Sequence, residues 1–368
     1  MENKSLCVLP FYHMDIQPNG VVKPCCEFSL DEMPRSVNVN DPAVFESVFF
    51  EDLRKKMATG IPIKGCKKCY FNETYSKNSL RLEHLDNFKK LSGKDFTVPL
   101  KNELVYVNLA LSNVCNNKCR MCNSRFSTSW YDDEKKLGID IPKGVVNQTT
   151  FFNLLDTSKI KFVNLTGGEP LLEQKKIIDF LNNCNLKELT LIITTNVTVI
   201  PNDDLISLLK ECKKVEWTLS IDAYESLNDF LRKGSNWDDT TKNLSWYYNN
   251  FEHIKINTVI SIYNCNCYDL LLGFIKNNFP KITHIHRLAD GAEWLSVKNL
   301  PNYAKQIIKE KNDFIKNVYK LNFSSIIEAE IDKEGNLEFF KDMDQKLNKI
   351  RNESWKDHNP ELYKLIYD

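Results

Sequence analysis

The chain has 368 residues, of which 42% are hydrophobic, so it is long enough for two domains with real cores. Its 49 basic and 49 acidic residues cancel, which disfavours nucleic acid as a partner because phosphate backbones attract a strongly positive field. No apolar run reaches the roughly 18 to 20 residues of a membrane helix or resembles an export signal. Its 12 cysteines, gathered in pairs and triads, therefore indicate metal sites in a reducing, cytoplasmic compartment.

The first segment, residues 1–85, gathers cysteines around a predicted hairpin. Strands at Tyr12–Gln17 and Val21–Val22 flank a Pro-Asn-Gly turn, and helical spacing follows from Asp41 to Met57. Four cysteines, arranged as two single residues and a C-x2-C pair, can hold zinc or an iron–sulfur cluster, and thiolate chemistry alone does not choose. These four residues are Cys7, Cys25, Cys66 and Cys69. A polar linker follows over residues 86–103.

Residues 104–300 alternate between predicted strands and helices. Helical patterns cover Lys175–Asn182, Asp203–Cys212, Asp238–Asn249 and Tyr268–Lys276. This alternation predicts parallel strands with right-handed crossovers, and ligands bind at the carboxyl ends of such strands. Six strands are too few for a closed eight-stranded barrel. They are expected at Leu104–Leu111, Ile160–Leu165, Glu188–Ile193, Val215–Leu219, Ile254–Ile262 and Ile282–His286.

A cysteine triad follows the first of these strands. Cys115, Cys119 and Cys122 have the spacing C-x3-C-x2-C. Three thiolates can hold three irons of a [4Fe–4S] cube and leave the fourth open, whereas a cluster that only carries electrons normally takes four protein ligands. An exogenous ligand would complete the site. On spacing alone, a zinc knuckle or part of a disulfide framework stays open as an alternative.

Three more motifs follow later strands: Thr166–Pro170 (TGGEP), Thr194–Asn196 (TTN) and Ser220–Asp222 (SID). Together with the triad, and in this order, they resemble the radical S-adenosylmethionine (SAM) enzymes over about Leu104–Pro301. The resemblance implies an α/β fold with a partial (β/α)6 TIM-like barrel. It also implies that the triad binds a [4Fe–4S] cluster, that SAM chelates the open iron, and that electron transfer yields a 5′-deoxyadenosyl radical.

The resemblance further implies which residues contact SAM. For six of them the residues alone leave an ordinary alternative. Met121 can be core, the Gly-Gly-Glu turn can be an ordinary strand-to-helix turn, Asp222 can cap a helix, and Arg232 can be a surface residue. An arginine that does bind the SAM carboxylate would pair with it bidentately. The implied contacts are Met121 at adenine, Gly167, Gly168 and Glu169 at the methionyl ammonium, Asn196 and Ser220 at the ribose and methionyl parts, with Asp222 and Arg232 beside them.

The N-terminal cysteines look like the twitch or SPASM-like auxiliary-cluster module of these enzymes, although that module more often follows the barrel. This likeness implies a second [4Fe–4S] cluster on Cys7, Cys25, Cys66 and Cys69, with Cys26 as a neighbour that can replace Cys25. Residues 301–368 carry no chemical motif and are predicted to form a helical extension.

These features together predict a radical SAM enzyme that abstracts a hydrogen atom from its substrate, in peptide or protein modification. Radical oxidation or rearrangement of a sugar or nucleotide is one alternative. A non-catalytic iron–sulfur scaffold or electron carrier is another, although such a protein needs neither an open iron nor the Gly-Gly-Glu turn. The expected partners are a substrate peptide or small molecule and an electron donor such as flavodoxin or ferredoxin.

Overall fold

The computed structural model describes residues 3–76, 79–141, 156–289, 292–319 and 324–368. The chain divides into two compact units, each built from several segments. The first unit contains Met1–Ser112, Val146–Ile193 and Asn202–Val215, and the second contains Asn113–Val145, Thr194–Pro201 and Glu216–Asp368.

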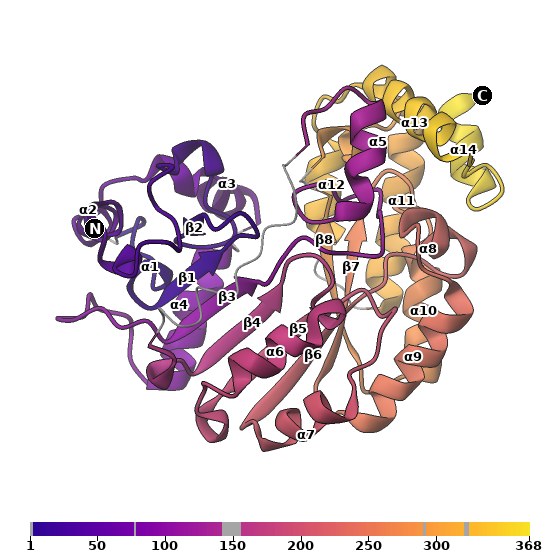
Figure 1. Cartoon of the computed structure of the whole chain (residues 1–368). Coiled ribbons are helices and arrows are strands. Elements are labelled where there is room, and N and C mark those ends of the chain that lie inside the picture. The colour runs from indigo at the N-terminus through magenta and orange to yellow at the C-terminus, as the bar shows by residue number, and fades with distance from the viewer. Residues whose placement is uncertain (1–2, 77–78, 142–155, 290–291, 320–323) are drawn as a thin grey trace. The chain divides into compact units, whose positions relative to one another are not determined.

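The strands form an open sheet in the order β2-β1-β3-β4-β5-β6-β7-β8 (Figure 1). The pairs with a defined register are parallel, except that β1 and β2 are antiparallel. The predicted α/β class with an open, partial barrel is therefore confirmed. The strands are β1 (His13–Ile16), β2 (Val22–Lys23), β3 (Tyr106–Ala110), β4 (Phe162–Thr166), β5 (Thr190–Thr195), β6 (Lys214–Ser220), β7 (Ile254–Ile260) and β8 (Thr283–Leu288).

All six predicted barrel strands are present as β3 to β8, each within two residues of the predicted ends. Their side chains follow the two-residue period of a strand. In β4, Val163 and Leu165 are fully buried whereas the intervening residues are half-buried, and β5 repeats this pattern. The four helices predicted between these strands are also present, so periodicity alone located the repeating part of the fold.

The N-terminal hairpin is confirmed, but its place in the sheet was not predicted. Strand β1 pairs in parallel with β3, from His13 opposite Tyr106 to Ile16 opposite Leu109, so the hairpin extends the sheet of the first unit. All four residues of β1 are buried, as expected for a strand covered on both faces. The predicted helix starts later than expected, because Ser47 is extended and separates a short 3-10 turn from α2.

The helices of the first unit lie before β1 or between successive strands in the chain. They are α1 (Leu9–Tyr12), α2 (Val48–Ala58), α3 (Lys67–Ser76), α4 (Leu80–Ser92), α6 (Gln174–Leu181) and α7 (Asp203–Glu211). A cluster of buried side chains, including Phe11, Phe28, Leu53 and Met57, packs under α2 around the N-terminal cysteines.

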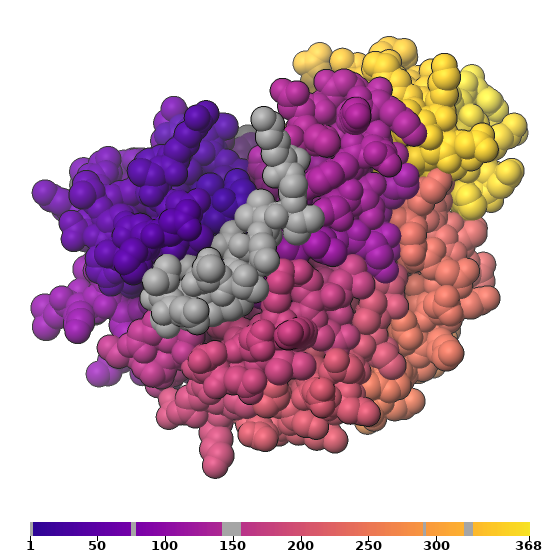
Figure 2. Space-filling model, viewed as in Figure 1, coloured from indigo at the N-terminus to yellow at the C-terminus, as the bar shows by residue number. Residues whose placement is uncertain are grey.

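The second unit carries the predicted C-terminal helical extension, which packs on the unit's own core. Phe340, Leu347 and Trp355 are buried together with Tyr263 in one apolar cluster. Helix α13 packs against α5, and the two form adjoining surface in Figure 2. The helices are α5 (Tyr131–Lys136), α8 (Ser226–Leu231), α9 (Trp237–Asn250), α10 (Tyr268–Asn278), α11 (Asn302–Tyr319), α12 (Ser324–Ile331), α13 (Leu337–Arg351) and α14 (Pro360–Tyr367).

No helix in the described ranges has both the length and the apolar character that a membrane crossing requires.

Candidate metal centres

The cysteine triad lies in the loop that follows β3, within the second unit. Cys119 is buried, and Cys115 and Cys122 are half-buried. The backbone N–H of Cys122 donates to the Cys119 carbonyl at 3.0 Å, and the indole N–H of Trp130 donates to the same carbonyl at 2.9 Å. The turn that carries the last two cysteines is therefore fixed by the chain itself.

Two nitrogen donors point at the sulfur of Cys115. The backbone N–H of Asn117 lies 3.4 Å from this Sγ, and the amide Nδ2 of Asn196 lies 3.8 Å from it. Asn196 Nδ2 also donates to Asn116 Oδ1 at 2.8 Å. Hydrogen bonds to the charged form of a group stabilise that form, so these donors favour the thiolate that iron requires. The SAM contact expected of Asn196 stays a prediction.

The three thiols share one electrostatic environment. The pKa of Cys119 is raised to about 11, chiefly by burial, and the charge of Arg232 opposes this shift. Burial also raises the pKa of Cys122, which both other cysteines increase, while Arg232 lowers it. Among the described residues, no three His, Cys, Asp or Glu side chains meet closely enough to hold a single metal ion. The donor set, three coupled thiols in one loop, fits the three-cysteine ligation of a [4Fe–4S] cluster.

Arg232 is a buried cation beside the triad, and Asp222 is its counterion. Arg232 Nη1 donates to Asp222 Oδ2 at 2.6 Å, and Asp222 Oδ1 accepts the backbone N–H of Val259 at 2.8 Å. Asp222 therefore holds Arg232 and β7, a role that the helix-cap alternative did not anticipate. Arg232 Nε is buried and has no hydrogen bond within the described part of the chain, which leaves one donor for an anionic ligand.

The Gly-Gly-Glu motif lies in the first unit, where β4 ends. Gly167 has φ +108°, and a Cβ there would stand 2.5 Å from the Ser112 carbonyl oxygen, so only glycine fits. The Gly168 N–H donates to that same oxygen at 2.9 Å. Glu169 is 1% exposed, and its carboxylate caps the following 3-10 turn by accepting the Leu171 N–H at 3.1 Å. The carboxylate is thus held in one position at the end of the sheet strands.

Two other predicted SAM contacts lie in the second unit. Met121, between the last two cysteines, is half-buried and packs against the apolar cluster of this unit. Ser220 is half-buried at the end of β6, in register with Asn257 of β7. Their contacts with SAM stay predictions.

The four N-terminal cysteines line one cavity in the first unit, whereas Cys26 is exposed and does not line it. The choice of Cys25 over Cys26 as the ligand stays a prediction. Four thiols around one cavity fit a fully ligated [4Fe–4S] cluster. Their donor chemistry also suits zinc, although the described side chains do not lie close enough together to hold a single ion. The cavity is lined by Cys7, Leu9, Pro10, Pro24, Cys25, Phe28, Met57, Cys66, Cys69, Leu80 and Arg81.

The charged groups at this cavity include the thiols, Arg81 and the Glu73 carboxylate that pairs with Arg81. The pKa of Cys7 and that of Cys66 are each raised to about 12, chiefly by burial and also by the charge of Cys69. Arg81 opposes the shift in both thiols. Its guanidinium donates twice to Glu73, at 2.9 and 2.6 Å, and once to the Leu6 carbonyl at 2.9 Å. A fixed cation therefore stands beside four groups that must become anionic to bind metal.

Sequence reasoning missed several residues of these centres. Arg81 is distant from its cysteines in sequence, and no motif contains it. Asn117 and Arg120 lie inside the cysteine motif itself, and a charged residue directly next to a metal ligand was a signal that could have been used.

Part of the chain is similar to known proteins. Residues 109–264 match the model of the radical SAM superfamily. The chain is 26% identical over 242 residues to GTP 3′,8-cyclase of Helicobacter pylori (strain ATCC 700392 / 26695), covering 64% of this chain and 68% of that protein. The same-named protein of Clostridium perfringens (strain 13 / Type A) is 27% identical over 160 residues, covering 43% of this chain and 47% of that protein.

Two solved structures show weaker similarity. "Native anSMEcpe with bound AdoMet" has a TM-score of 0.41 and 18% identity, covering 63% of each chain. Streptococcus suis SuiB bound to precursor peptide SuiA also has a TM-score of 0.41, with 19% identity, covering 78% of this chain and 64% of that one. The chain thus spans less than two thirds of either solved chain.

Proposed function

We propose that the chain is a radical SAM enzyme that cleaves SAM reductively and abstracts a hydrogen atom from a substrate. The match of residues 109–264 to the model of the radical SAM superfamily supports this proposal. The observation that carries the proposal is the triad. Cys115, Cys119 and Cys122 are coupled thiols in one loop, and the buried Arg232 beside them keeps an unused donor. Three ligands leave room for one exogenous chelator on a [4Fe–4S] cluster.

Several residues of the chain have separate proposed roles at this site. When bound, a [4Fe–4S] cluster on the triad supplies the electron that breaks a carbon–sulfur bond of SAM. Asn117 and Asn196 direct N–H donors at Cys115 and stabilise its thiolate. Arg232, neutralised on one side by Asp222, offers Nε to the SAM carboxylate, and Glu169 offers its carboxylate to the methionyl ammonium.

We also propose that Cys7, Cys25, Cys66 and Cys69 hold a second [4Fe–4S] cluster. The support is that all four line one cavity, with Arg81 beside them as a compensating cation. Four protein ligands leave no iron open, which is the arrangement of an electron-carrying cluster. SAM would therefore bind at the triad alone. A cytoplasmic flavodoxin or ferredoxin is the proposed electron donor.

The two candidate functions differ in their substrate. Peptide or protein modification is the function predicted for a radical SAM domain with an auxiliary module. A nucleotide is the second candidate, because the curated relatives are named GTP 3′,8-cyclase and align over 43% to 64% of this chain. Mass spectrometry after incubation with GTP, SAM and reductant distinguishes them, since only the second candidate predicts consumption of GTP.

The central test is anaerobic reconstitution with iron and sulfide, followed by reduction in the presence of SAM. The expected product is 5′-deoxyadenosine, detected by liquid chromatography. A protein whose triad cysteines are all replaced by alanine is the matched control and should form none. Reconstituted protein that holds iron, binds SAM and still releases no 5′-deoxyadenosine would contradict the proposed activity.

A further inference from the structure

Arg120 lies between two triad cysteines in sequence, yet its side chain points away into the protein interior. The residue is 1% exposed. Its guanidinium lies over the ring of Phe230, 3.9 Å from the centroid, and donates to the Tyr263 hydroxyl at 2.8 Å. A buried guanidinium is stable only when it is hydrogen-bonded and paired, so its partners determine where the backbone of the cysteine turn can lie.

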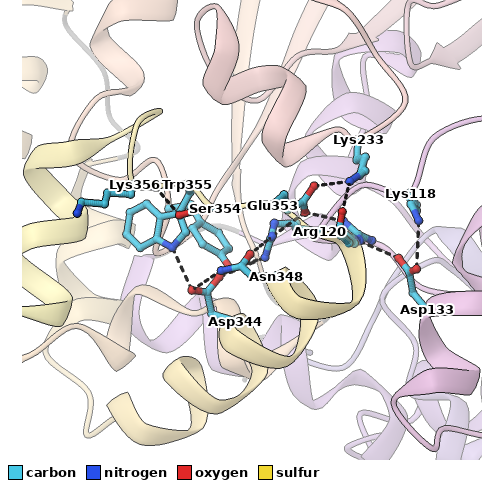
Figure 3. A network of polar contacts seen from close by, with 12 residues as sticks. Lys118, Arg120, Asp133, Lys233, Asp344, Asn348, Glu353, Ser354, Trp355 and Lys356 are labelled. Atoms are coloured by element: carbon cyan, nitrogen blue, oxygen red, sulfur yellow. Dashed lines mark hydrogen bonds and ion pairs between the residues drawn. The ribbon is translucent and has the colours of Figure 1, made fainter.

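The other partners of Arg120 belong to α13 and the turn after it (Figure 3). Arg120 Nη1 lies 3.2 Å from Asp344 Oδ1, and Nη2 donates to Asn348 and, at 2.7 Å, to Glu353. Asp344 also accepts from Tyr263, Trp355, Tyr367 and Asn348. One carboxylate on α13 thus joins the cysteine turn to the end of the chain.

A second connection runs from the other side of the same loop. Lys118 Nζ lies 3.1 Å from Asp133 Oδ1, and Arg351 Nε, near the end of α13, donates to Asp133 Oδ2 at 2.7 Å. Lys233 Nζ donates to Glu353 at 2.6 Å and to the Arg351 carbonyl at 3.0 Å. The side chains of Arg120, Arg351, Asp133 and Asp344 are all at most 2% exposed, so solvent screens these ion pairs little.

The backbone of the loop is bound to the segment that carries Arg232. The N–H of Lys118 donates to the Lys233 carbonyl, and the N–H of Arg120 donates to the Leu231 carbonyl, both at 2.8 Å. Cys119 therefore lies between two backbone anchors, and the residue after it is held by a side-chain anchor on α13. Ordinary packing would not require four buried charges at this one turn.

We propose that the segment from Leu337 to Trp355 is part of the cluster-binding site, and that Arg120 is a positioning residue that sets the turn between Cys119 and Cys122 through Asp344. The C-terminal extension would then determine how two of the three thiols are presented to iron. This inference rests on the proposed function, because it assigns a role at the same triad.

Three variants and one control test it. Arg120→Met removes the charge and keeps the stem, Arg120→Lys keeps the charge but loses the planar fork, and Asp344→Asn keeps the shape of the partner. Asp342→Asn is the control, because it lies on the same helix in a pair whose side chains are about half exposed, 56% for Lys346 and 53% for Asp342. Each protein is prepared without metal, and amide hydrogen exchange is measured by mass spectrometry.

The expected result is local. In Arg120→Met and Asp344→Asn, exchange in residues 115–122 should accelerate by about tenfold or more while the β6 and β7 amides keep their wild-type rates. Arg120→Lys should be intermediate, and Asp342→Asn should match wild type. After reconstitution, Arg120→Met and Asp344→Asn should also lose part of the roughly four irons expected at the triad.

Two results would overturn the inference. One is a folded Arg120→Met protein with wild-type exchange in residues 115–122 and full iron. The other is equal acceleration in all core amides, which would make Arg120 a general stability residue. The exchange measurement needs neither metal nor SAM, so it stands even if wild-type protein forms no 5′-deoxyadenosine, an outcome that would instead contradict the proposed function.

Discussion

The four-cysteine cavity of the first unit and the cysteine triad of the second both bury their thiols, but they are assembled in different ways. The cavity takes its cysteines from separate segments around a hairpin and two helices, and apolar side chains such as Leu9, Phe28 and Met57 wall it. The triad comes from a single loop, fixed by N–H donors at Cys115 and by buried ion pairs behind Cys119.

This difference fits the division of labour proposed above. Under that proposal the cavity supplies four thiols and thus a complete ligand set. The triad supplies three thiols, and Arg232 Nε beside it has no hydrogen bond in the described residues, so the proposal assigns the remaining iron site to an exogenous ligand. A cluster that must bind SAM needs the second arrangement, and one that carries electrons needs the first.

The largest expected effect is from loss of one triad ligand. Cys119→Ala should abolish 5′-deoxyadenosine formation, because a cluster that has lost a ligand no longer presents SAM with an ordered open iron. The assay is the anaerobic, reduced reaction with SAM. Detectable 5′-deoxyadenosine from a protein that contains no residual wild-type enzyme would show that the triad is not the site of SAM cleavage.

Loss of one cavity ligand should have a different result. Cys66→Ala should retain SAM cleavage and lose conversion of substrate, because the triad keeps its own ligands. Far-UV circular dichroism must accompany this assay, since metal sites contribute folding energy. If a folded Cys66→Ala protein converts substrate at the wild-type rate, the cavity has a structural role only.

A smaller effect is expected from Glu169. Glu169→Gln keeps the oxygen that accepts the Leu171 N–H but removes the charge offered to the methionyl ammonium. A hydrogen bond to a charged group contributes about 1.5–3 kcal/mol, so SAM affinity should fall by roughly 10- to 150-fold with iron content unchanged. Isothermal titration measures the affinity, and Glu188→Gln, on an exposed pair with Lys161, is the control. Equal affinities in both variants would leave Glu169 with only its capping role.

Acid should weaken the first unit through His13, which lies beside the cysteine hairpin. Its Nδ1 is 2.9 Å from the Pro24 carbonyl, and burial lowers its pKa to about 4. Between this value and the ordinary pKa of about 6.5, the unfolded chain binds the proton and the folded chain does not, so stability falls as pH falls through that range. The free energy of unfolding falls by on the order of 3 kcal/mol at most.

Thermal melts at pH 7 and pH 5 measure this loss in wild type and in His13→Gln. The variant should lose less stability between the two pH values, because it has no proton to bind at that position. Identical pH dependence in the two proteins would exclude His13 as a cause of acid sensitivity.

The smallest expected effect is from Cys26. Cys26→Ser should leave the iron content and the spectrum of the protein unchanged, because this thiol is exposed and lies outside the cavity. A loss of iron comparable to that of Cys25→Ser would show that Cys26, and not its neighbour, is the ligand.

Much of the fold was predictable because its repeating part obeys simple periods. Strands such as β4 and β5 alternate buried and half-buried residues, and the helices between them carry apolar stripes. The pairing of β1 with β3 was not predictable, since the period of a strand says nothing about its partner. The start of α2 was missed because an extended Ser47 interrupts a continuous helical pattern.

The same limit applies to the candidate site. Spacing predicted the triad and the C-x2-C pair of Cys66 and Cys69, because residues near in sequence stay near in space. Cys7 and Cys25 were added through the predicted hairpin and the likeness to an auxiliary-cluster module. Contacts between distant segments, such as those of Arg120 with Asp344 or of Arg351 with Asp133, have no local signal. The roles expected of Asp222 and Arg232 were assigned singly, whereas the structure pairs them.

The most direct test of the two-centre account is iron counting on anaerobically reconstituted protein. Wild type should hold about eight irons, four for each cube, and should fall to about four in Cys115/Cys119/Cys122→Ala and to about four in Cys7/Cys25/Cys66/Cys69→Ala. Of these two variants, only Cys7/Cys25/Cys66/Cys69→Ala, which keeps the triad, should change its electron paramagnetic resonance spectrum when SAM is added. Zinc in the N-terminal cavity, or about four irons in wild type, would contradict the account.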